Sequence, residues 1–526
     1  MALHVLRVAK LCVALLLAVG LSACANLPRN QAPPRPIIDG LDISMINTVF
    51  VRGFGEIKEH AFQDPDLDTL FVAALTGLNT IEPQLKTEKI GENVVVTYGE
   101  RKVAEIPPKA RGDVPEWSLV ALRTILAARK TSQKLKEADA DALYKAMFTS
   151  ALARIDPYSR YAPREAAMRN RLVRDGVIGL GVRVEMEDEG AWIRSLVFEG
   201  PSELAGLKIG DTIITANGTP LAGLSLPQAR RRLDGVIGTS LTLTVRRPGL
   251  PEPMTVIAAL DLVVPDTVTA TYTDGVLALH VRSFNQRTTS AVEKAINTAL
   301  ADKSQAFKGV VLDLRGDPGG LFDQAIEVAD LFLETGTIAT LHGRHPGANQ
   351  YYAAKRGDIT NGAPVAVIMD GKSASAAEIV AAALQDNHRA AIVGTVTWGK
   401  GSVQTLRRLP NGGEFALTWA RVIAPRGIEL HGLGLMPDIC LNGTATSVSD
   451  VVDTLYGDTR AADEVRRRWR TAADDINVHE TLRMDCPAEV RDGSAVDLEV
   501  ARRVVSDQAL FAIALRDDTP QLAVKP

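Results

Sequence analysis

Short apolar segments alternate with helical segments between about residues 265 and 445. Apolar runs of five or six residues are typical of strands buried on both faces, and such strands need helices packed over them. The pattern therefore predicts an α/β core built around a mostly parallel sheet. The expected strands are Val276–Val281, Gly309–Leu314, Pro364–Met369 and Ala390–Gly394, and the expected helices are Thr288–Ala301 and Ser375–Gln385.

Residues 177–247 show a different pattern, in which short β-type runs are separated by glycine-rich turns. One helical segment, Leu226–Leu233, lies before the last of these runs. The pattern predicts a compact, mostly β module of about 70 residues. Its expected strands are Ile178–Val184, Ala191–Val197, Thr212–Asn217 and Leu241–Val245.

The regions on either side are expected to be rich in helix. Residues 41–168 are mixed, with helices predicted around 115–130 and 138–154, the second ending before a turn at Asp156–Tyr161. Residues 446–526 are charge-rich and helical, and they contain no recognisable catalytic signature.

The N-terminus has the features of an export signal. Two basic residues, Arg7 and Lys10, precede the apolar run Leu11–Leu21, which is too short to span a bilayer. The following Ser-Ala-Cys resembles a bacterial lipobox, which implies that residues 1–23 are removed and that Cys24 becomes a lipidated N-terminus. An ordinary signal peptide with an incidental Cys24 is the alternative. By the same resemblance, Ala25 in place of Asp favours sorting to the outer membrane.

Residues 24–40 are proline-rich and are expected to act as a tether. Beyond the signal and the proposed lipid site, the chain has two cysteines, Cys440 and Cys486. In an oxidising periplasm they can form a disulfide, or they can remain two separate buried thiols. No cysteine–histidine cluster has the spacing of metal ligands, so no metal site is predicted.

Composition narrows the function further. The chain has 526 residues, a length that suggests about three or four domains. Hydrophobic residues make up 46% of it. The 59 Lys and Arg against 63 Asp and Glu give a net charge of −4. With no basic tract in the sequence, this charge argues against a nucleic-acid partner.

Two turns and one lysine carry candidate chemistry. Strand-to-helix turns are expected at Arg315–Gly320 and Asp370–Glu378, where backbone amides can stabilise developing negative charge. A serine in such a turn can equally be a helix cap. Lys400 lies between two glycines just past a buried strand, where desolvation would favour the neutral amine, although many such lysines lie in surface loops.

Taken together, the segments Ser373–Ile379, Ala383–Ala390 and Gly394–Gln404 resemble the signature of the C-terminal processing peptidases, which use a Ser/Lys dyad. The resemblance implies that Ser375 is the nucleophile, that Lys400 is the general base and that Gln404 supports it. The reaction would be acyl transfer through an acyl-enzyme.

The resemblance also implies an oxyanion site made by the amides of Ala376 and of a glycine in the Pro-Gly-Gly turn, with Gly319 favoured over Gly320. The chain departs from the family pattern at this turn, because Gly316 and Asp317 stand where Asn-Asn is usual. It also has Trp398 in place of the usual Phe.

The sequence contains other candidate nucleophiles and bases. Ser373 is a rival nucleophile whose alternative role is structural, and Lys372 is expected to point to solvent. His388 and His431 would be the histidines of a Ser/His/Asp triad, but nothing in the sequence fixes their geometry.

The β module resembles a PDZ domain. Its Ile178–Val182 stretch resembles the carboxylate-binding loop, and Pro201–Gly218 resembles the stretch that follows it. The resemblance implies that an extended peptide adds to a sheet edge while backbone amides bind its terminal carboxylate. A domain that acts only as a spacer is the alternative. The implied binding residues are Gly179, Leu180, Gly181 and Val182.

The combined prediction is a multidomain α/β protein with a crotonase-like peptidase core, an inserted PDZ domain and helical flanking regions. Its predicted function is that of a lipid-anchored serine endopeptidase of the cell envelope that needs no cofactor and binds the C-terminal tails of protein substrates. A helical-repeat adaptor is a further predicted partner. The alternatives are an inactive PDZ scaffold and an acyl-CoA enzyme, the latter disfavoured by the export signal. The predicted regions are 41–168 (N-terminal), 170–250 (PDZ), 251–445 (peptidase core) and 446–526 (C-terminal).

Overall fold

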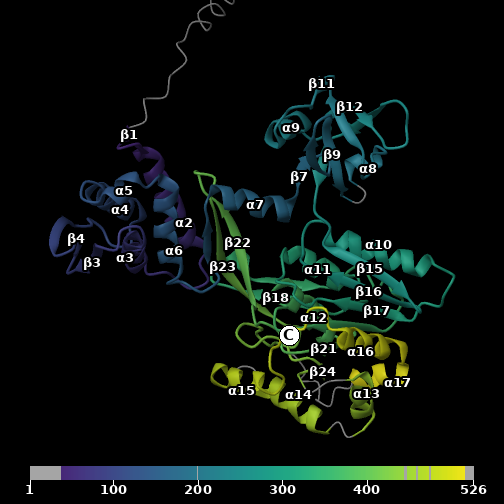
Figure 1. Ribbon diagram of the computed structural model, residues 1–526. Coiled ribbons are helices and arrows are strands. Elements are labelled where there is room, and N and C mark those ends of the chain that lie inside the picture. Colours follow the sequence, from purple (N-terminus) through teal and green to yellow (C-terminus); the bar gives the residue numbers. More distant parts are fainter. Residues whose placement is uncertain (1–36, 198–199, 444–446, 458–459, 473–474, 516–526) are drawn as a thin grey trace, which may run out of the picture.

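A computed structural model describes residues 37–197, 200–443, 447–457, 460–472 and 475–515 (Figure 1). The predicted signal peptide, Cys24 and most of the predicted tether lie outside these residues. The described chain forms a central α/β core, a second sheet beside it, an N-terminal region and a separate β domain.

The core is a six-stranded sheet that confirms the predicted α/β pattern. Its strands pair in parallel except for β15, which is antiparallel to β16 at one edge. The carboxyl ends of β17, β20 and β21 therefore lie side by side, and loops leaving them can meet at one site. In spatial order the strands are β15 (Val268–Thr273), β16 (Val276–Val281), β17 (Gly309–Asp313), β20 (Val365–Met369), β21 (Ala390–Gly394) and β24 (Ile439–Cys440).

Helices cover both faces of this sheet. One face packs against α10 (Thr288–Ala301), α11 (Phe322–Asp330) and α12 (Ala376–Asp386). The other face packs against the C-terminal helices, where Val500 and Val504 are fully buried among strand residues. The C-terminal helices are α13 (Val448–Tyr456), α14 (Arg460–Ala472), η4 (Ile476–Val478), α15 (His479–Arg483), α16 (Ala495–Ser506) and α17 (Gln508–Ala514).

This packing corrects the predicted separation of residues 446–526 from the peptidase core. The region is helical as expected, but α16 fills one face of the core sheet and is not a flanking appendage. The charge-rich sequence predicts helices but not their packing, and the valines of α16 form the buried side of that helix.

A second, antiparallel sheet was not predicted. Its strands run in the order β19 (Gln350–Ala353), β18 (Thr337–His342), β23 (Glu414–Ile423) and β22 (Ser402–Arg408), with η3 (Pro346–Ala348) between β18 and β19. The segment Asp156–Tyr161 is only partly the predicted turn, because β6 (Arg160–Ala162) pairs with β23. The sheet thus joins the N-terminal region to β23, and Ser159, just before β6, accepts a hydrogen bond from the Thr418 amide of that strand at 3.0 Å.

The N-terminal region confirms the helices predicted around 115–130 and 138–154. Its core is aromatic and continuous with the second sheet, since the rings of Phe148 and Phe415 lie 4.8 Å apart. The elements are β1 (Ile37–Ile38), β2 (Leu41–Asp42), α2 (Ile43–His60), α3 (Leu67–Thr76), η2 (Gly77–Thr80), β3 (Leu85–Ile90), β4 (Asn93–Tyr98), β5 (Arg101–Ile106), α4 (Val114–Arg129), α5 (Gln133–Glu137) and α6 (Ala140–Leu152).

The predicted β module is a separate domain, joined to the core through α7 (Arg164–Asp175) and a two-stranded stem of β7 (Val177–Gly179) and β14 (Asp261–Val263) (Figure 1). The predicted strand Ile178–Val184 is divided, because the backbone turns at Gly181, where φ is +74°. The other elements are β8 (Val182–Glu187), β9 (Gly190–Leu196), α8 (Pro201–Leu204), β10 (Thr212–Ala216), β11 (Thr219–Pro220), α9 (Leu226–Leu233), β12 (Ser240–Arg246) and β13 (Met254–Ala259).

The predicted domain boundary at 250 is too early. Strand β13 pairs with β12 along its whole length, so the module continues to Ala259 and the stem to Val263. The sheet order β13-β12-β10-β9-β8 leaves β8 at an edge, beside the predicted carboxylate-binding loop.

Candidate active site

Ser375 lies at the turn between β20 and α12, immediately before the first residue of the helix. Its φ of +57° and ψ of −114° are unusual for a residue with a side chain. Backbone strain of this kind persists only where the surroundings impose it. The turn places the serine at a helix N-terminus, where negative charge is stabilised.

Glu378 holds the backbones of Ser375 and Lys400 together. Its Oε2 accepts hydrogen bonds from the amides of Ser375 (2.8 Å) and Lys400 (2.9 Å), which places the two nitrogens no more than about 6 Å apart. Its Oε1 accepts from the Gly399 amide (2.7 Å) and from the Thr397 hydroxyl. The carboxyl is fully buried, and burial raises its pKa. Glu378 lies within the Ser373–Ile379 motif, but the sequence alone predicts no role for it.

The surroundings of Lys400 favour its neutral amine. Its Nζ lies 5.8 Å from the centre of the Tyr158 ring. Burial is the largest cause of a lowered Lys400 pKa, the positive charge of Arg160 lowers it further, and Glu378 opposes both. Because lysine is uncharged above its pKa, the lowered value extends the neutral form to lower pH. Tyr158 and Arg160 belong to a segment to which the sequence analysis assigned no role at the site.

Gln404 lies on β22 but does not donate to Lys400 in this structure. Its Nε2 contacts the hydroxyls of Ser402 (3.2 Å) and Thr418 (3.5 Å), and Thr418 in turn donates to Asp156 (3.0 Å). Gln404 is therefore part of the network that fixes the Asp156–Tyr161 segment beside the lysine. Its predicted support of Lys400 stays a prediction.

The Pro-Gly-Gly turn lies directly against the serine. A Cβ on Gly319 would come within 2.8 Å of Ser375 Cβ and 2.9 Å of the Ala376 nitrogen, so only glycine fits there. The Gly319 amide, however, donates to Asp317 Oδ1 at 2.7 Å. The preference for Gly319 as an oxyanion donor is therefore corrected for this conformation, since its N–H is already engaged. Asp317 is fully buried, which raises its pKa well above the usual value.

The rival nucleophile Ser373 has a structural role here. It is fully buried, its hydroxyl donates to the Leu314 carbonyl (2.8 Å), and it accepts from the Asp370 amide (2.9 Å). Lys372 is exposed, as expected. Trp398 is 56% exposed, and its backbone N–H donates to the Ser373 carbonyl at 3.0 Å.

The two candidate triad histidines lie elsewhere. His388 follows the far end of α12, a helix of eleven residues that is about 16 Å long. His431 packs edge-on against Tyr158 with ring centres 5.5 Å apart. Burial and then the charge of Arg421 lower the pKa of His431 to about 4. Neither histidine is hydrogen-bonded to Ser375 among the described residues.

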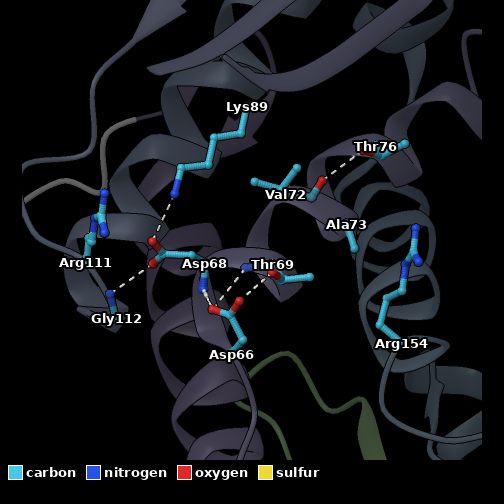
Figure 2. Close-up of a pocket in the computed structure, with 10 residues that line it drawn as sticks. All are labelled: Asp66, Asp68, Thr69, Val72, Ala73, Thr76, Lys89, Arg111, Gly112 and Arg154. Carbon is cyan, nitrogen blue, oxygen red and sulfur yellow. Dashed lines mark hydrogen bonds and ion pairs between the residues drawn. The ribbon is translucent and has the colours of Figure 1, made fainter. Parts of the chain in front are cut away.

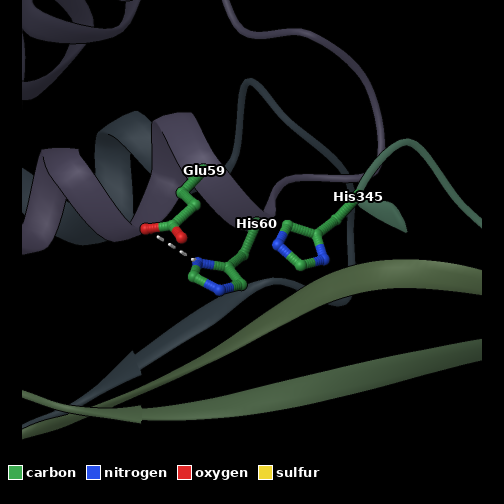
Figure 3. Close-up of side chains that lie close together, drawn as sticks. All are labelled: Glu59, His60 and His345. Atoms are coloured by element: carbon green, nitrogen blue, oxygen red, sulfur yellow. Dashed lines mark ion pairs between the residues drawn. The ribbon is translucent and has the colours of Figure 1, made fainter. Parts of the chain in front are cut away.

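Glu59, His60 and His345 gather where α2 meets η3 (Figure 3). His60 Nδ1 lies 3.1 Å from Glu56 Oε2, and its Nε2 contacts the Arg407 guanidinium. His345 Nδ1 accepts a hydrogen bond from the Gly347 amide. Because both nitrogens of His60 are engaged and a cation lies against one of them, this cluster fits a salt-bridged contact better than a metal site.

A cavity of about 590 Å³ lies in the N-terminal region, far along the chain from Ser375 (Figure 2). Its central carboxylate, Asp68, accepts from Lys89 (3.2 Å), from the Gly112 amide (3.0 Å) and from Trp117 Nε1 (2.7 Å). These hydrogen bonds join α3 to neighbouring elements, so Asp68 has a structural role in this cavity.

The predicted carboxylate-binding residues lie between the stem and the edge strand of the β module. Gly179 ends β7, Leu180 is buried in the module core, and Val182 begins β8. The carbonyls of Leu180 and Gly181 accept from the amides of Ser202 and Val197, which fixes the shape of the loop.

Cys440 and Cys486 form a disulfide, which is one of the two alternatives left open by the sequence. None of the described helices is long and apolar enough to cross a bilayer.

Comparison with known proteins agrees with a chain made of an α/β core and a separate β module. Residues 275–441 match peptidase family S41, and residues 192–247 match a PDZ domain. A carboxy-terminal-processing protease of Bartonella bacilliformis is 38% identical over 55% of this chain and 67% of its own length. The chain belongs to the carboxy-terminal processing peptidases. It is thus a serine-type peptidase with a PDZ domain.

Two further proteins are similar to parts of this chain. A carboxy-terminal processing protease of Bacillus subtilis is 31% identical over 54% of this chain and 60% of its own length. The solved structure of a photosystem II D1 C-terminal processing protease is 25% identical, with a TM-score of 0.36, over 72% of this chain and 93% of that one. Bacterial peptidases of this family are generally proteins of the periplasm or cell envelope.

Proposed function

We propose that this peptidase cleaves protein substrates with Ser375 as nucleophile and Lys400 as general base. The observation that carries the proposal is the pair of hydrogen bonds from the Ser375 and Lys400 amides to one oxygen of Glu378. A rigid bridge of this kind holds a nucleophile and its base in a constant relative position, which is where much of the rate of acyl transfer originates.

In the proposed reaction, Lys400 Nζ takes the proton from Ser375 Oγ as that oxygen attacks the peptide carbonyl. The tetrahedral oxyanion is stabilised by backbone amides, those of Ala376 and of Gly320 in the adjoining turn. Gly320 replaces Gly319 because the latter amide donates to Asp317. Lys400 then gives its proton to the departing amine, and it later deprotonates the water that hydrolyses the acyl-enzyme.

The test is cleavage of an unfolded protein by residues 25–526, compared with Ser375→Ala and Lys400→Ala. Each substitution should lower kcat by at least about 1,000-fold, because members of one catalytic unit fail together. Residual cleavage by Ser375→Ala would return the nucleophile to Ser373. An inert wild type, even with an envelope extract supplying an adaptor, would favour the scaffold function.

The PDZ domain is proposed to select substrates by their C-terminal tails. Strand β8 supports this, since an edge strand offers unpaired backbone groups to an extended peptide, and the Gly179–Val182 loop adjoins it. The crotonase-like form of the core remains part of the proposal.

Location and adaptor are further parts of the proposal. Lipidation of Cys24 would anchor the protein to the outer membrane on its periplasmic side, and the mass of the intact mature protein measures this modification directly. For the helical-repeat adaptor, we propose the exposed charged face of α14, where Glu464 and Arg467 form a surface ion pair. Loss of co-purification after reversal of both charges would support that site.

A further inference from the structure

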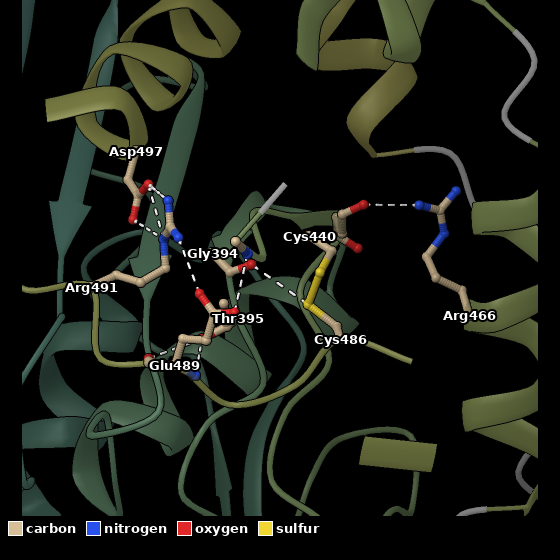
Figure 4. The surroundings of a disulfide bond; sticks show 10 residues. Gly394, Thr395, Cys440, Arg466, Cys486, Glu489, Arg491 and Asp497 are labelled. Carbon is tan, nitrogen blue, oxygen red and sulfur yellow. Dashed lines mark hydrogen bonds and ion pairs between the residues drawn. A yellow bond between two sulfur atoms is a disulfide. The ribbon is translucent and has the colours of Figure 1, made fainter. Parts of the chain in front are cut away.

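The C-terminal region crosses the edge of the core sheet where Ser375 lies. Residues 486–497, which we call the clamp segment, pass the loops that follow β17, β20 and β21. These are the loops that carry the glycine turn, the nucleophile and the base. The segment contacts all three. Figure 4 shows its residues Cys486 and Glu489 beside Gly394 and Thr395, at the end of β21.

The first contact is to the loop that ends in Ser375. The Gly371 amide donates to the Glu489 carbonyl at 2.7 Å, and the Arg491 amide donates to Asp370 Oδ2 at 3.0 Å. Asp370 is fully buried, and its Oδ1 accepts from the amides of Ser373 (3.1 Å) and Gly316 (3.0 Å). Through this one carboxylate, the clamp segment is joined to both the nucleophile loop and the glycine turn.

The second contact is to the loop that leads to Lys400. The Val396 amide donates to the Cys486 carbonyl (3.3 Å), and the Glu489 amide contacts the Thr395 hydroxyl (3.3 Å). Both loop residues lie within five positions of the lysine. Movement of the segment would therefore displace the base as well as the nucleophile.

The third contact is to Arg315, which precedes the glycine turn. Its Nη1 donates to the carbonyls of Arg491 (3.0 Å) and Ser494 (2.8 Å). The Arg491 guanidinium is held by the fully buried Asp497, through contacts of 2.7 and 2.9 Å. Arg491 is thus the side chain that anchors the segment to the start of α16.

The disulfide supplies the anchor at the other end. Cys486 opens the clamp segment, and its partner Cys440 lies on β24, the strand paired with β21. The two cysteines are 46 positions apart in the sequence, and α13, α14 and α15 lie between them. Without the covalent bond, the segment would be held at this end only by hydrogen bonds and by the packing of Cys486 among its buried apolar neighbours.

We propose that the clamp segment positions the catalytic loops, with Arg491 as its positioning residue, and that it does so fully only when Cys440 and Cys486 are bonded. This inference rests on the proposed Ser375 and Lys400 chemistry. It assigns to the C-terminal region a role in the reaction, in addition to any partner it binds.

The experiment measures kcat and KM for cleavage by wild type, Arg491→Ala, Arg491→Lys and the double variant Cys440→Ser/Cys486→Ser. Each rate is divided by the amount of Ser375 that reacts with an organofluorophosphonate, so that misfolded molecules do not count. We expect kcat per reactive serine to fall about 10-fold to 100-fold in Arg491→Ala and in the double variant, since small misplacements of catalytic groups have effects of this size. KM should change less, and Arg491→Lys should recover part of the rate.

Dithiothreitol gives an independent and reversible test. It is oxidised to its cyclic disulfide as the protein disulfide gains two electrons and two protons to become two thiols. Reduction should lower the wild-type rate to that of the double variant, leave the double variant unchanged, and be reversed by reoxidation. Arg503→Ala, on the exposed side of α16, is the matched control and should retain the wild-type rate.

Two results would overturn the inference in distinguishable ways. The first result is a wild-type rate per reactive serine in Arg491→Ala, in the double variant and in the reduced enzyme. It would contradict the positioning role of the clamp segment and leave the proposed Ser375 chemistry standing. An oxidised wild type that neither cleaves nor reacts at Ser375 would overturn both proposals.

Discussion

Arg160 approaches the proposed general base from β6, a strand that pairs with the sheet carrying Lys400. Its charge is the second cause of the lowered lysine pKa, after burial. At the scale of single residues, the base is therefore tuned by a cation from a distant part of the sequence. The motif predicts that Lys400 is the base, but no local pattern shows which charge will fold against it.

Arg160→Ala should move the acid limb of the pH–rate profile to higher pH. Removing the cation stabilises the protonated lysine, so its pKa rises and more alkali is needed to reach the neutral amine. The measurement is kcat/KM between pH 5 and 10 for wild type, Arg160→Ala and Arg160→Lys. Arg160→Lys keeps the charge and should follow wild type; an unmoved limb in Arg160→Ala would contradict the tuning.

Glu378→Gln should lower kcat by about 10-fold to 100-fold, because an amide cannot accept all four hydrogen bonds and each lost bond to a buried group costs about 1–3 kcal/mol. Glu293→Gln, an exposed glutamate on α10, is the control. Steady-state kinetics and thermal unfolding are measured on both. A Glu378→Gln enzyme with the wild-type kcat would show that the bridge does not position the dyad.

At the scale of the elements, hydrophobic periodicity correctly predicted the strands and helices that are buried in the same way along their whole length. The buried parallel strands and α10 and α12 agree closely with the sequence analysis, because burial on both faces leaves an apolar run of constant character. The long strand β23 was missed. It is a central strand of the second sheet and packs against the aromatic core of the N-terminal region, and contacts with such distant segments cannot be read from its own residues.

Strand β8 and its preceding loop lead to a prediction about recognition. A peptide with a free C-terminal carboxylate should bind the Ser375→Ala protein about 10-fold to 100-fold more tightly than the same peptide ending in an amide. The reason is that hydrogen bonds to a charged group contribute about 1.5–3 kcal/mol. Fluorescence anisotropy of labelled peptides measures the difference, and equal affinities would contradict a carboxylate-binding loop at Gly179–Val182.

At the scale of the whole molecule, the structure revises the predicted partition of the chain. The core sheet is completed by residues that sequence reasoning assigned to a flanking region, and the PDZ domain ends later than predicted. Composition reveals neither the packing of the C-terminal helices nor the end of the PDZ domain. A charge-rich helix with one apolar side has the same sequence pattern whether it lies outside the core or covers a sheet of the core.

Deletion of residues 446–526 should abolish folding of the core. It would expose the sheet face now covered by Val500, Val504 and Val505, each at most 2% exposed. Loss of the cooperative transition in differential scanning calorimetry is the expected result, with deletion of residues 516–526 alone as the control. A truncated chain that still unfolds cooperatively would support the predicted boundary at residue 445 between the peptidase core and the C-terminal region.

The stem of the PDZ domain has a consequence for how such enzymes diversify. The chain enters the domain through β7 and leaves it through β14, and Val177 and Val263 are paired neighbours. Paired residues of adjacent antiparallel strands lie about 5 Å apart, so the whole domain is inserted at what is nearly a single point of the backbone. Another recognition module with neighbouring ends can replace it without remodelling the catalytic half. Substrate choice and bond cleavage are thereby free to evolve separately within one gene.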